Sequence, residues 1–408
     1  MARTRYGVSP WIDESPKRRR PEFPRFGADA SYPVAIVGGG LAGIFTAYAF
    51  AAAGVKVALL EADRIGRGGA SRGPGILQAE AAASYRDVED RHGRKAARAL
   101  FDASRRAVLD LASAARRLGV TRIETHDAFR MLASHMAEEK PLARDVQLRR
   151  EAGLDVTWLT PAVAAREVNL DVGRPGARLR GWGQANPYDL LTAFAVGARD
   201  RGAQLFERSP VRRVKVRRKH VEVVVQGGVI QADTVIVCTG EPTDLYRSLK
   251  RHVRFEERYV GITGRLPTTV RRQMATVARV ITDTEAPPHL VRLLDDGRIA
   301  IAGADQPRTS ARAKDKIVVQ RTNQLMYELS RMFPSISGVQ PAYGWDLPMA
   351  TTADGVMYAG PHRNFPRHLF AWATRHDPAQ AFLASRILVR HFLGEAERDD
   401  RYFAFTRG

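Results

Sequence analysis

The stretch from Val34 to Glu61, VAIVGGGLAGIFTAYAFAAAGVKVALLE, limits what this chain can fold into more than any other segment. A β-branched run leads to three spaced glycines, then to an alanine-rich helical run and a second apolar strand. Gly38 allows a tight turn, Gly40 leaves the backbone open to a phosphate, and Gly43 lets the helix pack closely on the strand. The free N–H groups at the helix start attract an anion. The pattern predicts the first strand–helix–strand unit of a dinucleotide-binding fold.

The residues that follow the second strand extend this prediction. Glu61 stands about 20 residues after the glycines, where a carboxylate accepts hydrogen bonds from a ribose diol. A 2′-phosphate would be repelled there, so NADP is disfavoured. The next segment, ADRIGRGGASRGPG over residues 62–75, is rich in glycine and hydroxyl groups. Because this segment comes directly after the acidic residue, it is better explained as a source of hydrogen-bond donors for a ligand than as an ordinary surface loop.

Composition excludes several classes of protein. The 408 residues allow two domains with sizeable cores, and no apolar run is long enough to span a bilayer. The single cysteine, Cys238, excludes an internal disulfide and lies in an apolar strand-like run, so we expect an inert core residue and a cytoplasmic protein. Zinc-finger spacing, a P-loop and a GxSxG elbow are all absent from the sequence, so we expect no metal site and no hydrolase.

The net charge of +20 has two explanations. It could serve a polyanionic partner such as nucleic acid, or it could reflect a GC-rich genome that encodes arginine and alanine in excess. Basic residues are scattered through every segment, with small clusters at 17–20 and 212–219. We therefore favour the second explanation, and binding of nucleic acid remains possible but not favoured.

Caps and apolar spacing predict the main elements. Helices are expected over 85–118 with a break at Gly93, over 187–202 after Asn186, over 311–333 and over 378–393. Residues 1–30, with four prolines and a basic run, predict an extended arm that lies on the surface or is partly disordered, with Trp11 docking part of it. Strands are expected over 122–132, 204–207, 211–217, 221–226, 229–232, 233–240, 253–265, 289–294, 298–303 and 369–373.

Four further motifs accompany the fingerprint and point to a family. They are IGRGGASR over residues 65–72, NPYDL over 186–190, VIVCTG over 235–240 and WDLPMATTADGVMYAG over 345–360. With these motifs the chain resembles the FAD-dependent amine and amino-acid oxidoreductases of the D-amino-acid oxidase type across residues 32–393. Within that family it looks most similar to γ-glutamylputrescine oxidoreductase-like amine oxidases, which also carry an extended N-terminal arm.

The resemblance implies an α/β fold with two domains that are discontinuous in sequence. One is a Rossmann-like FAD-binding domain, and the other is an α+β substrate domain with a mixed sheet and helices. The expected division is an arm over residues 1–30, the FAD-binding domain over 31–85, 184–250 and 345–395, the substrate domain over 86–183 and 251–344, and a C-terminal tail over 396–408.

The cofactor that the resemblance implies is FAD. Members with covalently bound flavin use a cysteine near the C-terminal motif, and the only cysteine here is Cys238, so we expect non-covalent FAD. The fingerprint, Glu61 and the loop after it are expected to bind it, and the remaining contacts are carried over from the family. The expected cofactor-binding residues are Gly38, Gly40, Leu41, Ala42, Gly43, Glu61, Ala62, Arg67, Gly68, Gly69, Ala70, Ser71, Arg72, Val211, Thr239, Gly240, Asp354, Gly355 and Arg375.

Two departures from the family pattern concern the reactive end. Glycine-oxidase-like members carry an arginine before the TxDG turn to pair with the substrate carboxylate, and Met349 stands there in this chain. This favours an amine without a neighbouring carboxylate, unless Arg292 or another arginine substitutes. The family also has a glycine-rich run before the last helix, whereas this chain reads ATRHDPAQ over residues 373–380.

Amine oxidation asks little of side chains beyond orientation and electrostatics, because flavin accepts the hydride. The expected catalytic residues are His376, Tyr259, Arg292 and Trp345, with His376 able to donate to the N1–C2=O region of the flavin. An ordinary structural role is the alternative for each, and Tyr259 fits a core residue better.

The expected function is oxidation of a C–N bond of a primary or secondary amine, or of an amino-acid derivative, to an imine by hydride transfer to FAD. The electron acceptor, oxygen or a carrier, stays open. One alternative is a tRNA-modification flavoenzyme of the same fold, which the charge would serve. The other is a non-catalytic FAD-binding protein, which the missing glycines over residues 373–380 would favour.

Overall fold

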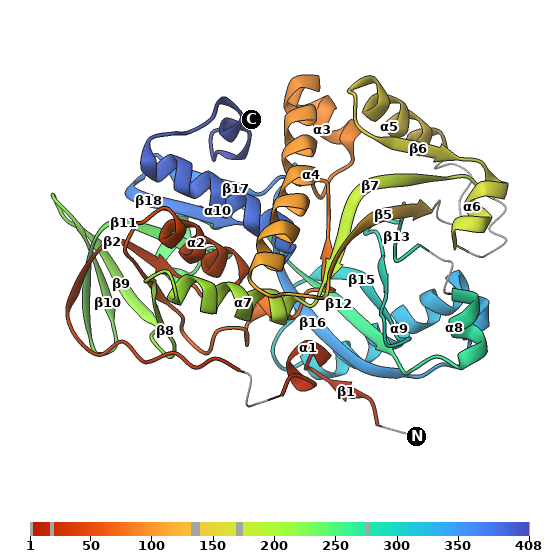
Figure 1. The fold of residues 1–408 in the computed structure, drawn as a ribbon, viewed down its shortest axis with the longest axis horizontal. Coiled ribbons are helices and arrows are strands. Elements are labelled where there is room, and N and C mark those ends of the chain that lie inside the picture. The colour runs from red at the N-terminus through yellow and green to blue at the C-terminus, as the bar shows by residue number, and fades with distance from the viewer. Residues whose placement is uncertain (1–2, 17–19, 132–138, 169–173, 275–277, 408) are drawn as a thin grey trace.

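The computed structural model describes residues 3–16, 20–131, 139–168, 174–274 and 278–407. Two sheets organise the chain, which is mixed α/β as expected, and they stand side by side with helices packed on both (Figure 1). Helix α4 (Arg94–Arg117) contacts α10 of the first part and strand β5 of the second. A shared core therefore joins the two halves.

The first sheet carries the fingerprint. Its middle strands run parallel, with β2 between β11 and β3, as a dinucleotide-binding fold requires. Helices α2 (Leu41–Ala52), α7 (Pro187–Arg199) and α10 (Pro378–Leu393) cover one face (Figure 1). The other face packs against β10. In order, the strands are β17 (Tyr358–His362), β18 (Phe365–Trp372), β11 (Gly228–Gly240), β2 (Ala30–Val37), β3 (Val57–Leu60) and β8 (Gln204–Phe206), with β10 (Val221–Val225) and β9 (Val211–Val216) attached to β11.

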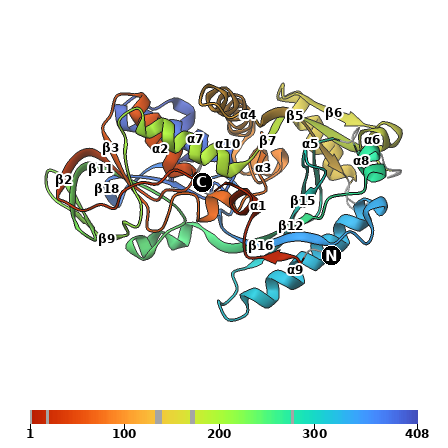
Figure 2. The same cartoon turned by 60° about the horizontal axis from the view of Figure 1, so that its bottom comes forward.

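The second sheet is mixed and more irregular. Helix α9 (Lys314–Met332) packs against β12, β15 and β16 (Figure 2). The strands, in order, are β1 (Arg5–Tyr6), β16 (Pro341–Thr351), β12 (Arg254–Thr263), β15 (Ile299–Pro307), β14 (Leu290–Leu293), β13 (Val280–Asp283), β5 (Ile123–Met131), β7 (Gly176–Ala185) and β4 (Ile76–Leu77), with β6 (Val156–Leu159) beside β7. The remaining helices are α1 (Pro10–Asp13), α3 (Tyr85–His92), α5 (Glu139–Glu151), α6 (Pro161–Val168) and α8 (Thr268–Met274).

Local chemistry explains where several helices begin and end. Gly93 separates α3 from α4 at a φ of 82°, which the left-handed region reserves for glycine. The Asn186 side chain accepts from the backbone N–H groups of Tyr188 and Asp189, and Pro187 opens α7. Asp377 caps α10 in the same way, by accepting from the Ala379 N–H at 2.8 Å. These starts match the sequence expectation.

Other elements differ from the expectation. Residues 229–232 and 233–240 form one continuous strand, β11, rather than two. Strand β7 was not expected, because its glycines and arginines interrupt the apolar alternation that predicts a strand. A Cβ at Gly183 would lie 2.4 Å from the Glu124 carbonyl oxygen, so this strand needs glycine for close approach to β5.

The N-terminal arm is docked in its described part. β1 pairs in parallel with β16 (Figure 2). The Trp11 side chain of α1 is buried. Trp11 therefore docks part of the arm, as was expected from its large apolar side chain.

The boundaries of the domains remain a proposal. Strand β16 pairs with β12 as far as Thr351, so residues 345–351 lie in the second sheet instead of the expected FAD-binding domain. We propose that the third segment of that domain begins after Thr351. Among the described residues, no helix is long and apolar enough to cross a membrane.

A buried histidine ties α9 to the second sheet. His289 Nδ1 lies 2.6 Å from Asp283 Oδ2, and His289 Nε2 lies 2.8 Å from Glu328 Oε2 of α9. Burial lowers the pKa of His289, but the hydrogen bonds to the two carboxylates outweigh it and raise this pKa to about 10. The imidazolium is therefore the form that stabilises the folded chain.

We predict a stability loss in alkaline solution that depends on His289. In the unfolded chain its pKa is near 6.5, so the contribution is complete below that pH and is lost as pH rises from 6.5 through about 10. Denaturant unfolding across this range should show the decline. His289→Gln should lower the free energy of unfolding by about 3 kcal/mol at neutral pH and flatten the decline. His220→Gln, in the turn between β9 and β10, is the control. An unchanged slope in His289→Gln would contradict the assignment.

Candidate functional site

A cavity of about 650 Å³ lies at the carboxyl ends of β2, β3 and β11. Ligands of parallel α/β sheets bind at this edge. Each wall comes from a different segment, and the fingerprint forms one of them. The lining residues include 37–38, 40–42, 60–62, 68–70, 210–212, 238–240, 243–245, 350 and 374–376.

The three glycines of the fingerprint have the environments that a dinucleotide site needs. Gly38 has a φ of 105°, and its missing Cβ would lie 2.7 Å from the Cys238 carbonyl oxygen. A Cβ on Gly43 would lie 1.8 Å from the Gly38 carbonyl oxygen, so α2 can approach β2 only through glycine. Gly40 instead borders open space, with no atom within 4 Å of a Cβ. As its N-cap, Gly40 leaves the first N–H groups of α2 uncapped beside the cavity.

Glu61 lies at one end of the cavity and is held in place by the backbone. Its Oε2 accepts from the Gly39 N–H at 2.6 Å, and its Oε1 accepts from the Asp63 N–H at 2.9 Å. Each carboxylate oxygen keeps a further lone pair for a ribose hydroxyl. The adenosine end of a dinucleotide is therefore expected here.

The residues present fit FAD. The cavity runs from Glu61 past the start of α2 to Gly68, Ala350 and His376. Added Cβ atoms on Gly68 and Gly240 would meet nothing within 4 Å, as at Gly40, so all three glycines border free space. Bound FAD would rest its pyrophosphate on the N–H groups of α2, with the flavin ring at the His376 end.

The loop before α10 keeps the backbone shape that glycines would give. Ala373, Arg375 and His376 have φ values of 61°, 52° and 55°, all in the left-handed region. Each such residue costs about 1–2 kcal/mol. The turn is fixed by hydrogen bonds from the Ala373 N–H to Gly240 and from the Asp377 N–H to Thr374. The missing glycines have therefore not removed the turn.

His376 lines the cavity as a neutral imidazole. Its Nε2 donates to the Pro348 carbonyl oxygen at 2.7 Å, and burial lowers the pKa of the ring. The ring lies against Gly69, where an added Cβ would be 2.1 Å from Cε1. Because a neutral ring carries one proton and Nε2 holds it, Nδ1 can only accept. The expected donation from His376 to the flavin is not available in this arrangement.

Arg375 is half-buried and places its guanidinium group at the same end of the cavity. Its Nε has no hydrogen-bond partner in the described part of the chain, and burial lowers its pKa to about 10. Nearby, Arg258 is neutralised by Asp305 through bonds of 2.7 and 2.6 Å. Arg375 is therefore free to bind an anion between the cavity and the second sheet.

The other expected catalytic residues do not line the cavity. Tyr259 is buried toward α9, where its hydroxyl donates to Glu257 and accepts from Gln306. Trp345 donates to the Arg72 carbonyl oxygen at 2.8 Å, and Arg292 donates to backbone oxygens of the same loop. Trp345 and Arg292 hold the loop rather than face the cofactor cavity.

Most of the expected cofactor residues do line the cavity. Those that do are Gly38, Gly40, Leu41, Ala42, Glu61, Ala62, Gly68, Gly69, Ala70, Val211, Thr239, Gly240 and Arg375. Those outside its lining are Gly43, Arg67, Ser71, Arg72, Asp354 and Gly355. Asp354 instead pairs with Arg407 at 2.8 Å and His92 at 3.1 Å, which ties the TxDG turn to the C-terminal tail.

Several lining residues were not expected, namely Pro210, Arg212, Thr243, Asp244, Leu245, Ala350 and Thr374. Arg212 follows Val211 and could have been inferred from it. The others come from segments that only the topology brings to this edge.

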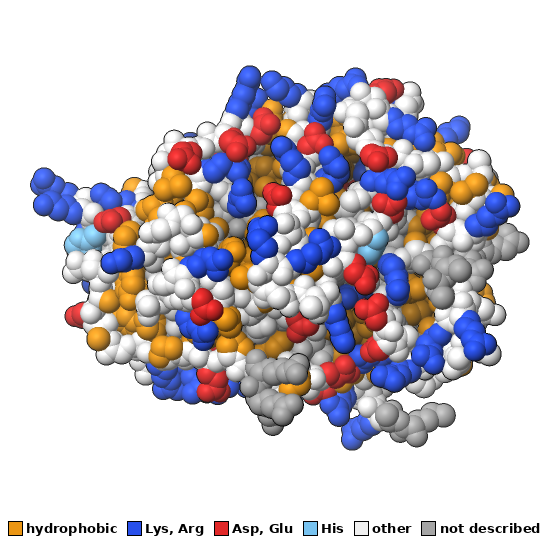
Figure 3. Space-filling view, viewed as in Figure 1, with side chains coloured by type: hydrophobic (Ala, Val, Ile, Leu, Met, Phe, Trp, Pro, Cys, Tyr) orange, Lys and Arg blue, Asp and Glu red, His pale blue; other side chains and the backbone are white. Residues whose placement is uncertain are grey.

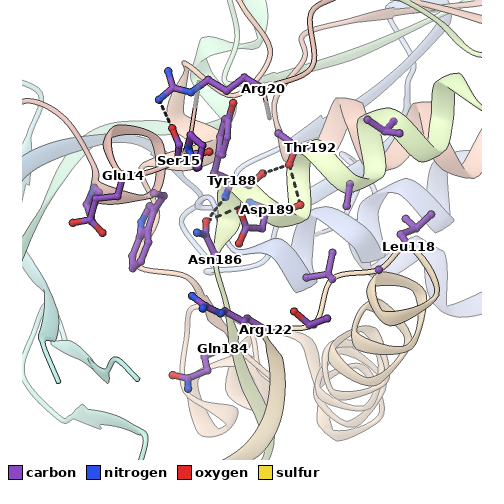
Figure 4. A pocket seen from close by; sticks show the side chains of 18 of the residues that line it. Glu14, Ser15, Arg20, Leu118, Arg122, Gln184, Asn186, Tyr188, Asp189 and Thr192 are labelled. Atoms are coloured by element: carbon purple, nitrogen blue, oxygen red, sulfur yellow. Dashed lines mark hydrogen bonds between the residues drawn. The ribbon is translucent and has the colours of Figure 1, made fainter. Parts of the chain in front are cut away.

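A second cavity of about 1010 Å³ lies between the arm, the start of α7 and the turn after β14 (Figure 4). It is larger, but it shares no lining residue with the first. One of its arginines, Arg298, is paired with Glu14 at 2.6 and 2.8 Å, and Asn186 serves as the cap of α7. We assign it no chemistry. Over the described ranges, no group of three or more potential metal ligands is gathered.

Fold and site together define a flavin-dependent oxidoreductase. The chain matches the family model for FAD dependent oxidoreductases (DAO) over residues 33–388 and belongs to that family. It is 25% identical over 346 residues to glycine oxidase of Bacillus licheniformis, covering 83% of this chain and 87% of that protein. It is 24% identical over 396 residues to the probable oxidoreductase OrdL of Haemophilus influenzae, covering 92% and 86%.

Solved structures share the fold. Glycine oxidase from Geobacillus kaustophilus superposes with a TM-score of 0.77 at 20% identity, over 93% of this chain and 99% of that one. L-proline dehydrogenase from P. horikoshii gives a TM-score of 0.75 at 16% identity, over 94% and 97%. The protein is thus an FAD-dependent enzyme by family, as the resemblance implied.

We predict that Gly40→Val folds but loses FAD. The φ of Gly40 is −74°, which any residue adopts, and a Cβ meets no protein atom, so the fold should tolerate valine. The side chain would occupy the space of the pyrophosphate and raise the Kd for FAD roughly 100-fold or more. Titration of the apoprotein with FAD, beside a thermal melt, measures both effects. Gly27→Val, also in open space, is the matched control. FAD affinity at the wild-type level in Gly40→Val would refute this site.

Proposed function

We propose that the protein oxidises the C–N bond of a primary or secondary amine, or of an amino-acid derivative, to an imine. FAD supplies the hydride acceptor when bound. The single observation that carries the proposal is the cavity that joins the fingerprint to Ala350, Arg375 and His376 beside the second sheet. Relatives with related folds are named for such substrates, as glycine oxidase and iminodiacetate oxidase are.

The residues at the reactive end suit an uncharged amine. His376 is neutral, and Met349, which is 1% exposed, adds no charge from β16. The pair of Arg258 and Asp305 is internally balanced. The imine product would leave the site and hydrolyse in water.

We further propose that Arg375 binds the carboxylate of the substrate. Arg292, the other candidate, already donates to four acceptors, namely Gln184 and the carbonyl oxygens of Pro74, Gly75 and Ala185. Arg375 has an unpartnered Nε beside the cavity. A guanidinium group whose buried Nε has no partner favours a carboxylate, which can accept two parallel hydrogen bonds from it. An amino acid or N-substituted amino acid is therefore the favoured substrate.

We also propose that FAD is bound without a covalent link and that the protein works in the cytoplasm. The only cysteine in the sequence, Cys238, is buried, and burial raises the pKa of its thiol to about 12. Cys238 lies behind Gly38 and Gly43 of the fingerprint, beside the start of α2 where the pyrophosphate would rest. An unreactive thiol of this kind fits a reducing compartment.

The tRNA-modification alternative has less support. On the face seen in Figure 3, arginine and lysine side chains alternate with acidic ones instead of forming one basic surface. Many arginines are neutralised in pairs, as Arg308 is by Glu241. Retention of RNA that falls steeply with salt would favour this alternative.

We predict that anaerobic addition of an amino-acid substrate bleaches the flavin absorbance. A panel of α-amino acids, N-methyl amino acids and simple amines should give bleaching chiefly with carboxylate-bearing members. Arg375→Met should raise the KM for these about 100-fold, because the paired charge is lost, while amines without a carboxylate change little. Arg308→Met, which removes a surface-paired arginine, is the control. A yellow protein that no amine bleaches would overturn the proposed reaction, and equal losses on all substrates would overturn the role of Arg375.

A further inference from the structure

Five successive backbone carbonyl groups, Ser71 to Gly75, are held by side chains from outside their loop. Ser9 Oγ donates to Ser71 at 2.7 Å, and Trp345 Nε1 donates to Arg72 at 2.8 Å. Trp11 Nε1 donates to Gly73 at 3.0 Å. Arg292 Nη1 donates to Pro74 and Gly75, each at 3.1 Å. We call the four donors Ser9, Trp11, Arg292 and Trp345 the loop clamp.

The loop needs such a clamp because of its composition. Residues 62–75 include Gly66, Gly68, Gly69, Gly73 and Gly75, so ordering them costs more entropy than ordering other residues. Only the short turn Gly69–Ser71 is helical within it. External hydrogen bonds must therefore fix its shape.

The loop has two sides with different neighbours. Gly68, Gly69 and Ala70 line the cofactor cavity, whereas the carbonyl groups of Ser71 and Gly73 accept from the arm. The loop thus lies between the arm and the cofactor cavity.

The arm supplies two of the four donors and is itself anchored on the second sheet. The Gly7 N–H donates to Gly344 at 2.9 Å, and Arg72 returns a bond to the Gly7 carbonyl oxygen at 3.2 Å. Glu14 pairs with Arg298 at 2.6 and 2.8 Å.

Trp11 is the centre of these contacts. It is 7% exposed, and the Arg292 guanidinium carbon lies 5.3 Å from the centroid of its ring. Trp11 therefore contacts Arg292, another member of the loop clamp, through the face of its ring and the loop through its N–H.

We propose that the arm is part of the cofactor site. Its docking holds residues 65–75 in the shape that binds FAD, so docking of the arm and binding of FAD stabilise each other. Such coupling is reciprocal: the factor by which the docked arm strengthens FAD binding equals the factor by which FAD stabilises the docked arm. Trp11 and Ser9 are positioning residues, since they act on the cofactor through the loop.

The test measures affinity for FAD in apoprotein of the full chain. Trp11→Phe keeps an aromatic ring over Arg292, removes the N–H donor and makes the buried side chain smaller, whereas Ser9→Ala removes a donor with little change in volume. Trp11→Phe should raise the Kd for FAD about fivefold, and Ser9→Ala, which removes one hydroxyl, should raise it by a similar factor. Trp158→Phe is the matched control, because Trp158 lies in β6 of the second sheet, and its Kd should equal that of the wild type.

Hydrogen–deuterium exchange supplies the reciprocal measurement. In the wild type, FAD should slow exchange of amides within residues 3–16, and in Trp11→Phe this protection should shrink in step with the loss of affinity. Two results would overturn the proposal: Kd values for FAD that are unchanged in both variants, or arm amides that exchange at the same rate with and without FAD. Neither readout needs turnover, so a failure to oxidise amines would not affect this test. If Trp11→Phe folds poorly, the Kd of Ser9→Ala for FAD provides the test.

Discussion

A backbone carbonyl group that leaves water must find a donor, and in this molecule that requirement shapes the region between the two sheets. The loop after β3 has almost no secondary structure with which to satisfy its own carbonyl groups. Donors reach it from the arm, from β14 and from β16. β14 and β16 are strands of the second sheet, and the arm is attached to that sheet through β1. The loop over residues 62–75 belongs to the FAD-binding half, but its carbonyl groups are hydrogen-bonded by donors of the other half. This loop therefore connects the two halves.

The reactive end is built under more strain than the adenosine end. At the adenosine end, glycines stand where the backbone needs them, and Glu61 accepts two backbone N–H groups without distortion. At the reactive end, Ala373, Arg375 and His376 hold left-handed conformations that their side chains disfavour. Burial also raises the pKa of Asp377, next in the chain, to about 7. Strain and buried charge gathered at one place are typical of functional sites, because a structure optimised for stability alone would avoid both.

Much of the fold could be predicted from the sequence because its signals are local. The glycine fingerprint, the Asn186 cap and the Gly93 break each act within a few residues, and each predicted element is present. Strand β7 could not be predicted, because its glycines are required by the close approach of β5, which is far away in the sequence. Its apolar alternation is therefore missing, although the strand lies between β5 and β4 in the sheet.

The candidate site divides in the same way. The wall formed by the fingerprint and the loop follows from residue types, since a phosphate needs N–H groups and small residues. Arg292 and Trp345 were expected to be catalytic, yet both donate to loop carbonyl groups. Nothing in a single sequence separates an arginine that binds substrate from one that binds backbone, because the difference lies in which acceptors the fold brings within 3 Å.

In the proposed function, the positive charge available to a substrate lies on the loop before α10 and not on the sheet. Met349 on β16 offers none, and Arg258 on β12 is neutralised by Asp305. Arg375 enters instead from the FAD-binding half, on a turn fixed by the start of α10. A substrate anion bound there would be held by the same half that holds the cofactor. The distance from that anion to the flavin would then be set by one rigid turn, and motion between the two sheets would not alter it.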